Sequence, residues 1–208
     1  MRKLIVSMNI SLDGFMAGSD SELNWHFDYW SEELARFACE QLSSADTIIL
    51  GRITYEVMAE YWRRQTNLSM ERGDLVFADM MNNYKKIVFS KTLQKTEWNN
   101  ARLAKENMKT EILKLKKECT RKNIIVLGSG SVVTSLMRLN LVDELVLWMH
   151  PVILSEGNFF FNSLQKRYAL HLLNAKRFNS GVIILHYEVI NEVVNQKNFL
   201  YGKVFVER

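Results

Sequence analysis

Three short segments of this sequence combine glycine, hydroxyl and basic residues in patterns that suit the binding of an anion. They contribute Gly51, Arg52 and Thr54; Ser90 and Lys91; and Gly128, Ser129, Gly130, Ser131 and Val132. A glycine turn that opens a helix leaves unpaired backbone N–H groups at the positive end of the helix dipole, where a phosphate can bind. Arg52 adds a planar cation that can donate two parallel hydrogen bonds to a phosphate. The chemistry that these residues suggest is the binding of a phosphorylated ligand.

None of these segments is a complete nucleotide-binding motif. The dinucleotide fingerprint G-x-G-x-x-G/A is broken at Val133, and no lone acidic residue closes a strand about 20 residues later. A tight turn between a strand and a helix explains the glycines of residues 128–130 equally well. A surface salt bridge explains Arg52 equally well.

The elements that would position these segments follow from hydrophobic periodicity. Apolar or alternating runs predict strands at residues 3–10, 46–50, 86–89, 124–127 and 144–147, and a final hairpin of two long strands at 168–178 and 182–190. Helical spacing predicts helices from Ser31 to about Leu42, from about Thr54, and over residues 74–84, 107–119 and 132–139. This alternation predicts an α/β fold whose sheet is mostly parallel and carries antiparallel strands at one end.

The predicted sheet places the three segments close together. Each of them follows a predicted strand directly, and the carboxyl ends of parallel strands lie along one edge of a sheet. Three anion-binding segments on one edge favour a polyphosphate ligand over unrelated turns. The cations Arg52 and Lys91 suit an extra phosphate on a ribose, which favours NADPH over NADH.

Composition limits the other classes of function. The chain has 208 residues, of which 48% are hydrophobic and 24% charged, as in an ordinary globular protein. The net charge is +4, and we expect the lysines of residues 105–122 to form a solvated helix face and not a nucleic-acid site. Cys39 and Cys119 are isolated, which predicts reduced thiols and no metal site. No run approaches the roughly 18 apolar residues of a membrane span, and we expect a cytoplasmic protein without a signal peptide.

Several motifs carry a resemblance to a known family. They are Val6–Gly14 (VSMNISLDG), Leu50–Glu56 (LGRITYE), Val126–Gly130 (VLGSG), Leu141–Leu145 (LVDEL), and Pro151–Leu154 followed by Gly157. Together they resemble the dihydrofolate reductase-like superfamily and, within it, stand-alone relatives of the C-terminal reductase domain of the bifunctional riboflavin-biosynthesis deaminase-reductase. The resemblance covers about residues 2–189, and the H-x-E and P-C-x-x-C motifs of the deaminase half are absent.

The resemblance implies a fold, a cofactor and an assembly. The fold is a three-layer one with a mixed, mostly parallel eight-stranded sheet flanked by helices, the cofactor is NADPH, and the protein is often a homodimer. One reductase domain would span residues 1–190. Residues 191–208 would be an extension, either an extra strand that contributes to a dimer or a frayed tail.

The resemblance also implies roles for residues. Gly51, Arg52 and Thr54 would hold the phosphates or the adenosine ribose, and Ser90 and Lys91 would flank the adenosine end. Residues 128–132 would carry the pyrophosphate. Asn9, Ser11 and residues 13–18, which include Gly18, would border the nicotinamide. Glu33 is the candidate catalytic carboxylate, with Asp28 second, although charge complementarity at a helix start explains Glu33 equally well. Trp25, His26 and Trp30 are weaker candidates for the substrate side, because a core or surface role is the simpler account of each.

Two functional hypotheses follow. The leading one is an NADPH-dependent reductase that transfers hydride to a small heterocycle or a ribosylamino-pyrimidine. The alternative is a nucleotide-binding or regulatory protein that kept the fold without turnover. Absence of a carboxylate near the substrate would favour the alternative.

Overall fold

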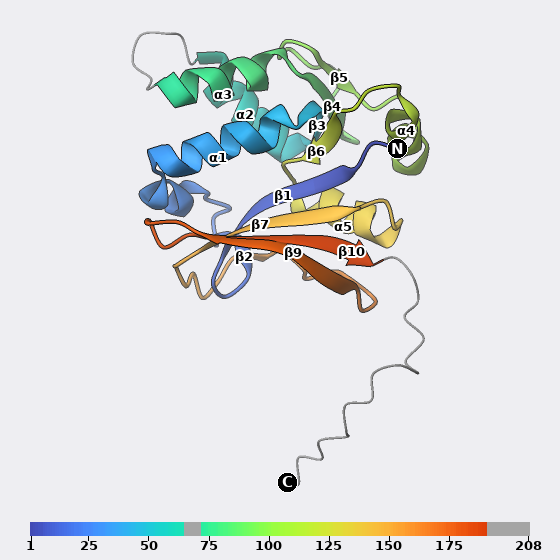
Figure 1. Ribbon diagram of the computed structural model, residues 1–208. Helices are drawn as coiled ribbons and strands as arrows, with labels where there is room; N and C mark the ends of the chain where they lie inside the picture. The colour runs from blue at the N-terminus through green and yellow to red at the C-terminus, as the bar shows by residue number, and fades with distance from the viewer. Residues whose placement is uncertain (65–71, 191–208) are drawn as a thin grey trace, which may run out of the picture.

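The computed structural model describes residues 1–64 and 72–190 (Figure 1). Its strands are β1 (Leu4–Ser11), β2 (Phe15–Ala17), β3 (Ala45–Gly51), β4 (Lys85–Phe89), β5 (Ala101–Leu103), β6 (Asn123–Val126), β7 (Glu144–His150), β8 (Asn158–Phe159), β9 (Ala169–Arg177) and β10 (Ile183–Ile190). Its α-helices are α1 (Glu32–Ser43), α2 (Arg52–Arg64), α3 (Arg72–Asn83), α4 (Met108–Lys117) and α5 (Gly130–Arg138), and a 3-10 helix, η1 (Asn24–Tyr29), precedes α1.

Eight of these strands form one twisted sheet in the order β5-β4-β3-β6-β1-β7-β10-β9. The first six run parallel, and β10 pairs antiparallel with both β7 and β9. The predicted α/β class, the mostly parallel eight-stranded sheet and the terminal hairpin are therefore confirmed. The strands β6 and β7, which flank helix α5 in sequence, are separated in the sheet by β1.

Helices cover both faces of the sheet and complete three layers (Figure 1). On one face, apolar side chains of α1, α2 and α3 pack against the strands in two clusters that include Leu34, Leu42, Tyr55 and Met81. On the other face, α4 and α5 bury residues such as Ile112 and Leu136 against the strands. The strands β3 and β6 contain continuous apolar runs, at residues 48–50 and 124–126, because both of their faces are covered.

Local signals explain where two of the helices begin. Ser31 caps α1, since its hydroxyl accepts a hydrogen bond from the Leu34 N–H at 3.3 Å. Asn107 caps α4 in the same way, through the Thr110 N–H at 3.0 Å. Both helix starts lie where the sequence predicts them.

The structure also contains short elements that the sequence pattern did not predict. The strands β2, β5 and β8 have three residues or fewer, and η1 has six. A run of two or three residues cannot show a periodicity, so only tertiary pairing defines these elements.

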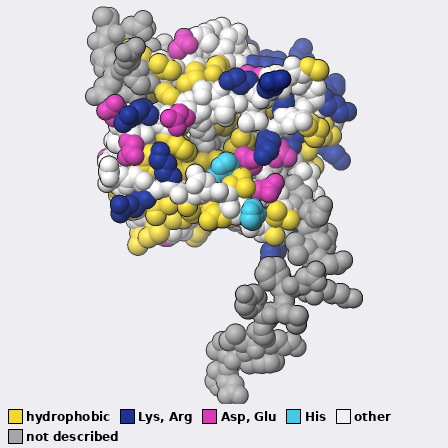
Figure 2. Space-filling model, in the orientation of Figure 1, with side chains coloured by type: hydrophobic (Ala, Val, Ile, Leu, Met, Phe, Trp, Pro, Cys, Tyr) yellow, Lys and Arg dark blue, Asp and Glu magenta, His cyan; other side chains and the backbone are white. Residues whose placement is uncertain are grey.

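One lysine departs from the predicted solvated face of α4. Lys and Arg side chains do gather over this helix (Figure 2). Lys116, however, is buried, and its Nζ lies 2.5 Å from Asp143 Oδ2. That ion pair joins α4 to the start of β7 and explains the aspartate of the Leu141–Leu145 motif.

Two further predictions concern the C-terminal extension and membrane-spanning helices. The extension of residues 191–208, whether strand or tail, lies outside the described residues. Within the described residues, every helix is too short or too polar to cross a bilayer.

Candidate functional site

The carboxyl ends of β3 and β6 meet in direct contact. The Gly51 N–H donates a hydrogen bond to the Gly128 carbonyl oxygen at 2.8 Å. A Cβ atom on Gly51 would lie 2.4 Å from Ser129 Oγ, which is closer than real contacts allow. Two of the three segments in which the sequence suggests anion binding, residues 51–54 and 128–132, therefore form one structure.

The other two glycines of this structure also lie in close packing. Gly128 has a φ of +118°, and a Cβ there would lie 2.9 Å from Thr54 Oγ1. A Cβ on Gly130 would lie 2.4 Å from the methyl carbon of Met16 in β2. We call residues 51–54 and 128–132 the glycine cradle. Its glycines are explained by contacts within the protein, and these contacts fix the backbone amides at the start of α5.

The start of α5 differs from the capped starts of α1 and α4. Ser129 occupies its N-cap position but makes no capping hydrogen bond, and its hydroxyl instead lies 2.9 Å from the Ser131 hydroxyl. The amides of Gly130, Ser131 and Val132 therefore keep their donors for an outside acceptor. Two hydroxyls and the positive end of a helix suit a phosphate group at this point.

Arg52 and Lys91 are the two cations that the sequence suggests for the adenosine end of a cofactor. Arg52 is the first residue of α2, and its Nη1 lies 2.9 Å from Glu56 Oε2, so the surface salt bridge considered for it does form. Both partners are more than two-fifths exposed, and such pairs contribute only about 0–1 kcal/mol, so a phosphate can replace Glu56. Gly51 pairs with Phe89 in the sheet, so the chain leaves β3 at Arg52 and leaves β4 at Ser90 and Lys91 from the same edge of the sheet.

Ser90 has a structural task of its own. Its hydroxyl oxygen accepts hydrogen bonds from the Thr92 N–H at 3.1 Å and the Leu93 N–H at 2.8 Å. These two hydrogen bonds stabilise the turn that directly follows β4. Lys91, by contrast, is exposed.

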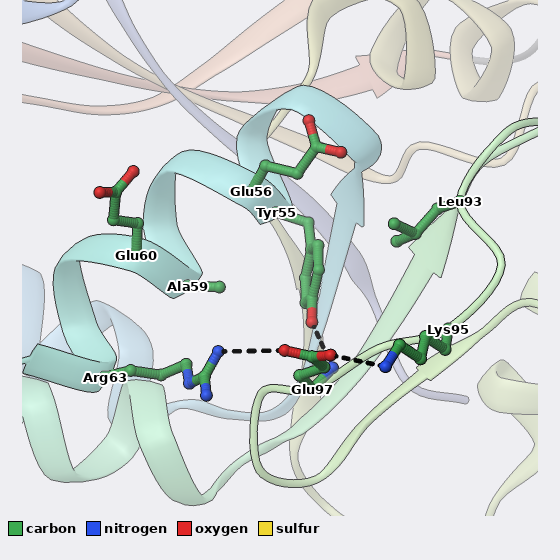
Figure 3. Close-up of a pocket in the computed structure, with 8 residues that line it drawn as sticks. All are labelled: Tyr55, Glu56, Ala59, Glu60, Arg63, Leu93, Lys95 and Glu97. Atoms are coloured by element: carbon green, nitrogen blue, oxygen red, sulfur yellow. Dashed lines mark hydrogen bonds and ion pairs between the residues drawn. The ribbon is translucent and has the colours of Figure 1, made fainter.

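An open groove of about 610 Å³ lies along α2, beyond Arg52 (Figure 3). It is lined by Tyr55, Glu56, Ala59, Glu60, Arg63, Leu93, Lys95 and Glu97. The Tyr55 hydroxyl accepts from the Glu97 and Trp98 N–H groups, while Glu97 pairs with both Lys95 and Arg63. Three carboxylates against two cations do not suit a pyrophosphate, so the groove is a border of the cradle and not the anion site itself.

The next strand end, that of β1, is held by a compact loop. The Asp13 carboxylate accepts from the Ser11 hydroxyl at 2.6 Å and from the Leu154 and Ser155 N–H groups at 3.2 and 2.8 Å. Burial raises the pKa of Asp13, but these hydrogen bonds outweigh it and hold the pKa below its ordinary value. The aspartate of the S-L-D-G motif therefore ties the loop after β1 to the loop after β7.

A cluster of aromatic rings follows at the ends of β1 and β7. We call Trp25, His26, Tyr29 and His150, with Asn9, the ring cluster. The centroid of His150 lies 5.2 Å from Trp25, 5.7 Å from Tyr29 and 6.0 Å from His26. His150 Nε2 lies 3.0 Å from Asn9 Oδ1, although the two residues are 141 positions apart in sequence.

Both histidines of the ring cluster are neutral at pH 7. Burial lowers the pKa of His26 to about 4. Burial, with a smaller contribution from the charge of His26, lowers the pKa of His150 to about 4. Sequence reasoning missed His150, whose only signal was its position at a strand end before the single proline, and it ranked Trp25 and His26 low.

The structure gives the positions of the remaining predicted residues, and their roles stay predictions. Glu33 lies in the first turn of α1, is half-buried and has no hydrogen-bond or ion-pair partner among the described residues. Asp28, in η1, and Trp30 are exposed. Gly18 lies in the turn after β2, where its N–H donates to the Glu22 carbonyl oxygen at 3.1 Å.

These features form one row along the carboxyl edge of the sheet. In spatial order they follow β4 (Ser90, Lys91), β3 and β6 (the glycine cradle), and β1 and β7 (the ring cluster). The five strands are adjacent and parallel. The donor set fits a dinucleotide, because open amides and hydroxyls lie in the middle, exposed cations at one end and an uncharged aromatic cluster at the other.

Comparison with known proteins places the chain in a family. The family model described as "RibD C-terminal domain" matches residues 2–184. The uncharacterized protein YyaP of Bacillus subtilis is 31% identical over 186 residues, which are 89% of this chain and 94% of YyaP. A second uncharacterized protein of that organism, YwjB, is 26% identical over 189 residues, 89% of this chain and 97% of YwjB.

Solved structures share the fold. A putative riboflavin biosynthesis protein from Shewanella sp. PV-4 superimposes with a TM-score of 0.70 at 17% identity, over 90% of this chain and 99% of that one. A diaminohydroxyphosphoribosylaminopyrimidine deaminase/5-amino-6-(5-phosphoribosylamino)uracil reductase from Thermotoga maritima gives 0.63 at 15% identity, over 91% of this chain and 57% of that one. With the family model matching most of its length and the fold agreeing, this chain belongs to the RibD C-terminal domain family, a family of reductase type.

Proposed function

We propose that this protein is an NADPH-dependent reductase of the riboflavin-biosynthesis type. It transfers hydride to a C=N or carbonyl carbon of a small heterocycle or a ribosylamino-pyrimidine. The observation that carries the proposal is the row of features along five adjacent parallel strands, from the exposed cations at β3 and β4 through the glycine cradle to the ring cluster. A ligand with a phosphorylated ribose, a pyrophosphate and a planar ring has its chemical groups in the same order.

Each part of the row has a task in this proposal. Arg52 and Lys91 bind the ribose phosphate, and the amides of residues 130–132 bind the pyrophosphate. Asn9 and Ser11 border the nicotinamide, which supplies the hydride when the cofactor is bound. The uncharged ring cluster, in which Trp25 and His150 are buried, limits the access of water to the reacting groups. Glu33 is proposed to supply a proton, because it is half-buried and its carboxylate is not committed to another described side chain.

The similar proteins support the reaction class. The Thermotoga protein is by its own description a 5-amino-6-(5-phosphoribosylamino)uracil reductase, and the part of it that this chain covers has the same fold. Family membership makes reduction the first reaction to test.

The test separates binding from turnover. NADPH and NADH are titrated by protein fluorescence, and NADPH oxidation is then followed by absorbance with dihydrofolate and with 5-amino-6-(ribosylamino)uracil, with and without its 5′-phosphate. We expect tighter binding of NADPH and oxidation with at least one substrate. Failure to bind either reduced nucleotide would overturn the proposal.

The alternative is a nucleotide-binding or regulatory protein without turnover. Two carboxylates of this region are poorly suited to proton transfer, which favours the alternative. Asp13 is already committed to hydrogen bonds with the loop after β7, and Asp28 is exposed. Binding of NADPH without oxidation by any of these substrates, together with unchanged behaviour of Glu33→Gln, would support this alternative.

A further inference from the structure

Two buried nitrogen atoms of the ring cluster have no hydrogen-bond partner among the described residues. They are Trp25 Nε1 and His150 Nδ1. Trp25 is 9% exposed and His150 is 2% exposed, so bulk solvent does not reach either side chain freely. Buried polar atoms in proteins are nearly always paired, because an unpaired one loses the hydrogen bond it had with water. The two atoms belong to rings whose centroids lie 5.2 Å apart, so an outside group that reaches this cluster can supply hydrogen-bond partners to both.

The contact with Asn9 defines the hydrogen-bonding role of each atom. Asn9 Oδ1 is an acceptor, so His150 Nε2 carries the hydrogen of this 3.0 Å contact in the assigned arrangement. A neutral imidazole has a single N–H, and its other nitrogen has a free lone pair. His150 Nδ1 is therefore an acceptor, and the indole Nε1–H of Trp25 is a donor.

Building on the proposed reductase function, we infer that Trp25 and His150 bind the lactam edge of a neutral, planar heterocycle. The ring carbonyl oxygen accepts a hydrogen bond from Trp25 Nε1–H, and the ring N–H donates one to His150 Nδ1. The sequence offers Trp25 only as a weak candidate for the substrate side and does not single out His150.

The surroundings of the two atoms restrict the ligand further. His26 and Tyr29 add aromatic surface next to His150, which suits a flat ring. The imidazoles are neutral, so the cluster offers no ionic partner, and a charged ring would lose its hydration without compensation. Recognition of the ring thus depends on neutral groups and leaves Glu33 for proton supply.

The decisive experiment observes Trp25 directly. Protein labelled with ¹⁵N-tryptophan is titrated with uracil in the presence of NADP⁺, and the indole N–H signals are followed by NMR, with the Trp25 signal assigned from Trp25→Phe. We expect a saturable downfield shift of the Trp25 signal. The Trp98 signal, whose Nε1–H already donates to Asn82 Oδ1 at 2.7 Å, should not move and serves as the internal control.

A blocked ligand tests whether the lactam edge is what binds. 1,3-Dimethyluracil keeps the ring and the carbonyl groups but has no N–H to donate to His150. It should bind about tenfold more weakly than uracil, as expected for the loss of one hydrogen bond to a buried group. Equal affinity for uracil and 1,3-dimethyluracil, or no shift of the Trp25 signal with uracil, would overturn the inference.

A matched pair of variants tests His150. A glutamine amide can reach the position of Nε2 and keep the Asn9 contact, whereas an asparagine amide lies near the position of Nδ1. His150→Gln should therefore weaken uracil binding about tenfold, and His150→Asn, which keeps a polar group near the position of Nδ1, should weaken uracil binding less. Loss of binding in both variants to the same extent, with both folded by circular dichroism, would contradict the assignment of Nδ1.

The outcomes also separate this inference from the function it builds on. NADPH binding and turnover without a response of Trp25 would overturn the ring site and leave the reductase function standing. A response of Trp25 in a protein that does not bind NADPH would support the ring site and overturn the reductase function.

Discussion

Single residues at this sheet edge are defined as much by their neighbours as by their own chemistry. Arg52 pairs with Glu56 on the surface, yet it stands at the first turn of α2 beside the cradle. His150 is an ordinary strand residue in the sequence, but its burial and its contact with Asn9 give it a fixed tautomer. Predictions at this scale therefore concern affinity and protonation.

Arg52→Ala should weaken NADPH binding much more than NADH binding. The guanidinium is proposed to contact the ribose phosphate, which NADH lacks, and a charge-assisted hydrogen bond contributes about 1.5–3 kcal/mol, or roughly 10- to 150-fold in affinity. Fluorescence titration of both nucleotides measures the difference. Glu56→Ala is the matched control, since it breaks the same salt bridge but should not weaken NADPH. An equal loss for NADH and NADPH would show that Arg52 does not touch that phosphate.

Protonation of His26 and His150 should make the protein less stable in mild acid. Their pKa values are about 4 in the folded state against an ordinary value of 6.5, so between these values the unfolded chain binds protons that the folded one does not. Stability from each histidine is fully present above pH 6.5 and is lost as the pH falls toward 4, at up to about 1.4 kcal/mol per pH unit. Urea unfolding of the wild type and of His150→Gln, from about pH 8 to about pH 4, measures how the free energy of unfolding changes with pH. We expect the free energy of unfolding to fall less steeply with decreasing pH for the variant. Parallel curves for the two proteins would show that the pKa of His150 is not lowered by folding.

Among the elements, the contact between β3 and the start of α5 is the most demanding. The backbones approach so closely that the position of Gly51 admits no side chain, with Ser129 Oγ and Val132 Cγ2 at 2.4 and 3.1 Å from an ideal Cβ. This contact orients the open amides of α5 toward the sheet edge. The helix start is thus positioned by packing and not by a capping side chain.

Gly51→Ala should therefore impair NADPH binding and stability together. The new methyl group must push the start of α5 away, and misplaced packing of this kind costs about 1–3 kcal/mol. Adding Ser129→Gly removes the nearest clashing atom and should recover part of the stability. Urea unfolding and NADPH titration of the single and double variants measure both effects. If Gly51→Ala is as stable as the wild type, the start of α5 can shift without a loss of folding free energy, and the close contact does not fix its position.

At the scale of the whole molecule, strand β9 is unusual. All nine of its residues are exposed, and Leu170 and Leu172 remain 40% and 48% exposed. Hydrophobic side chains gather in this region of the surface (Figure 2). Within the described residues, β9 pairs with β10 alone, so its outer edge presents free N–H and C=O groups.

We propose that this edge and its apolar side chains pair with a second copy of the chain to form a homodimer. A two-fold axis lets the same strand of each copy supply both sides of the contact. Leu172→Glu should convert a dimer into a monomer in size-exclusion chromatography with light scattering, because it introduces a charge into the apolar contact. Leu139→Glu, at the end of α5 and 39% exposed, is the control that should remain dimeric. A monomeric wild-type protein at micromolar concentration would refute the proposal.

The sequence alone determined the type and order of the long elements. The apolar runs of residues 46–50 and 124–127, the cap at Ser31 and the turn signal before β10 are local patterns, and local sterics and hydrogen bonding translate them into strands and helices. The glycine segments were visible for the same reason. A glycine followed by helical spacing predicts the start of a helix wherever it occurs.

Only the tertiary structure decided which side chains meet. The order of strands in the sheet placed Asn9 against His150 across 141 residues, buried Lys116 against Asp143 and left Trp25 Nε1 without a partner among the described residues. Periodicity specifies which face of an element is buried, but it does not specify which strand becomes its neighbour. That choice depends on the packing free energy of the whole sheet, to which residues far apart in the chain contribute together.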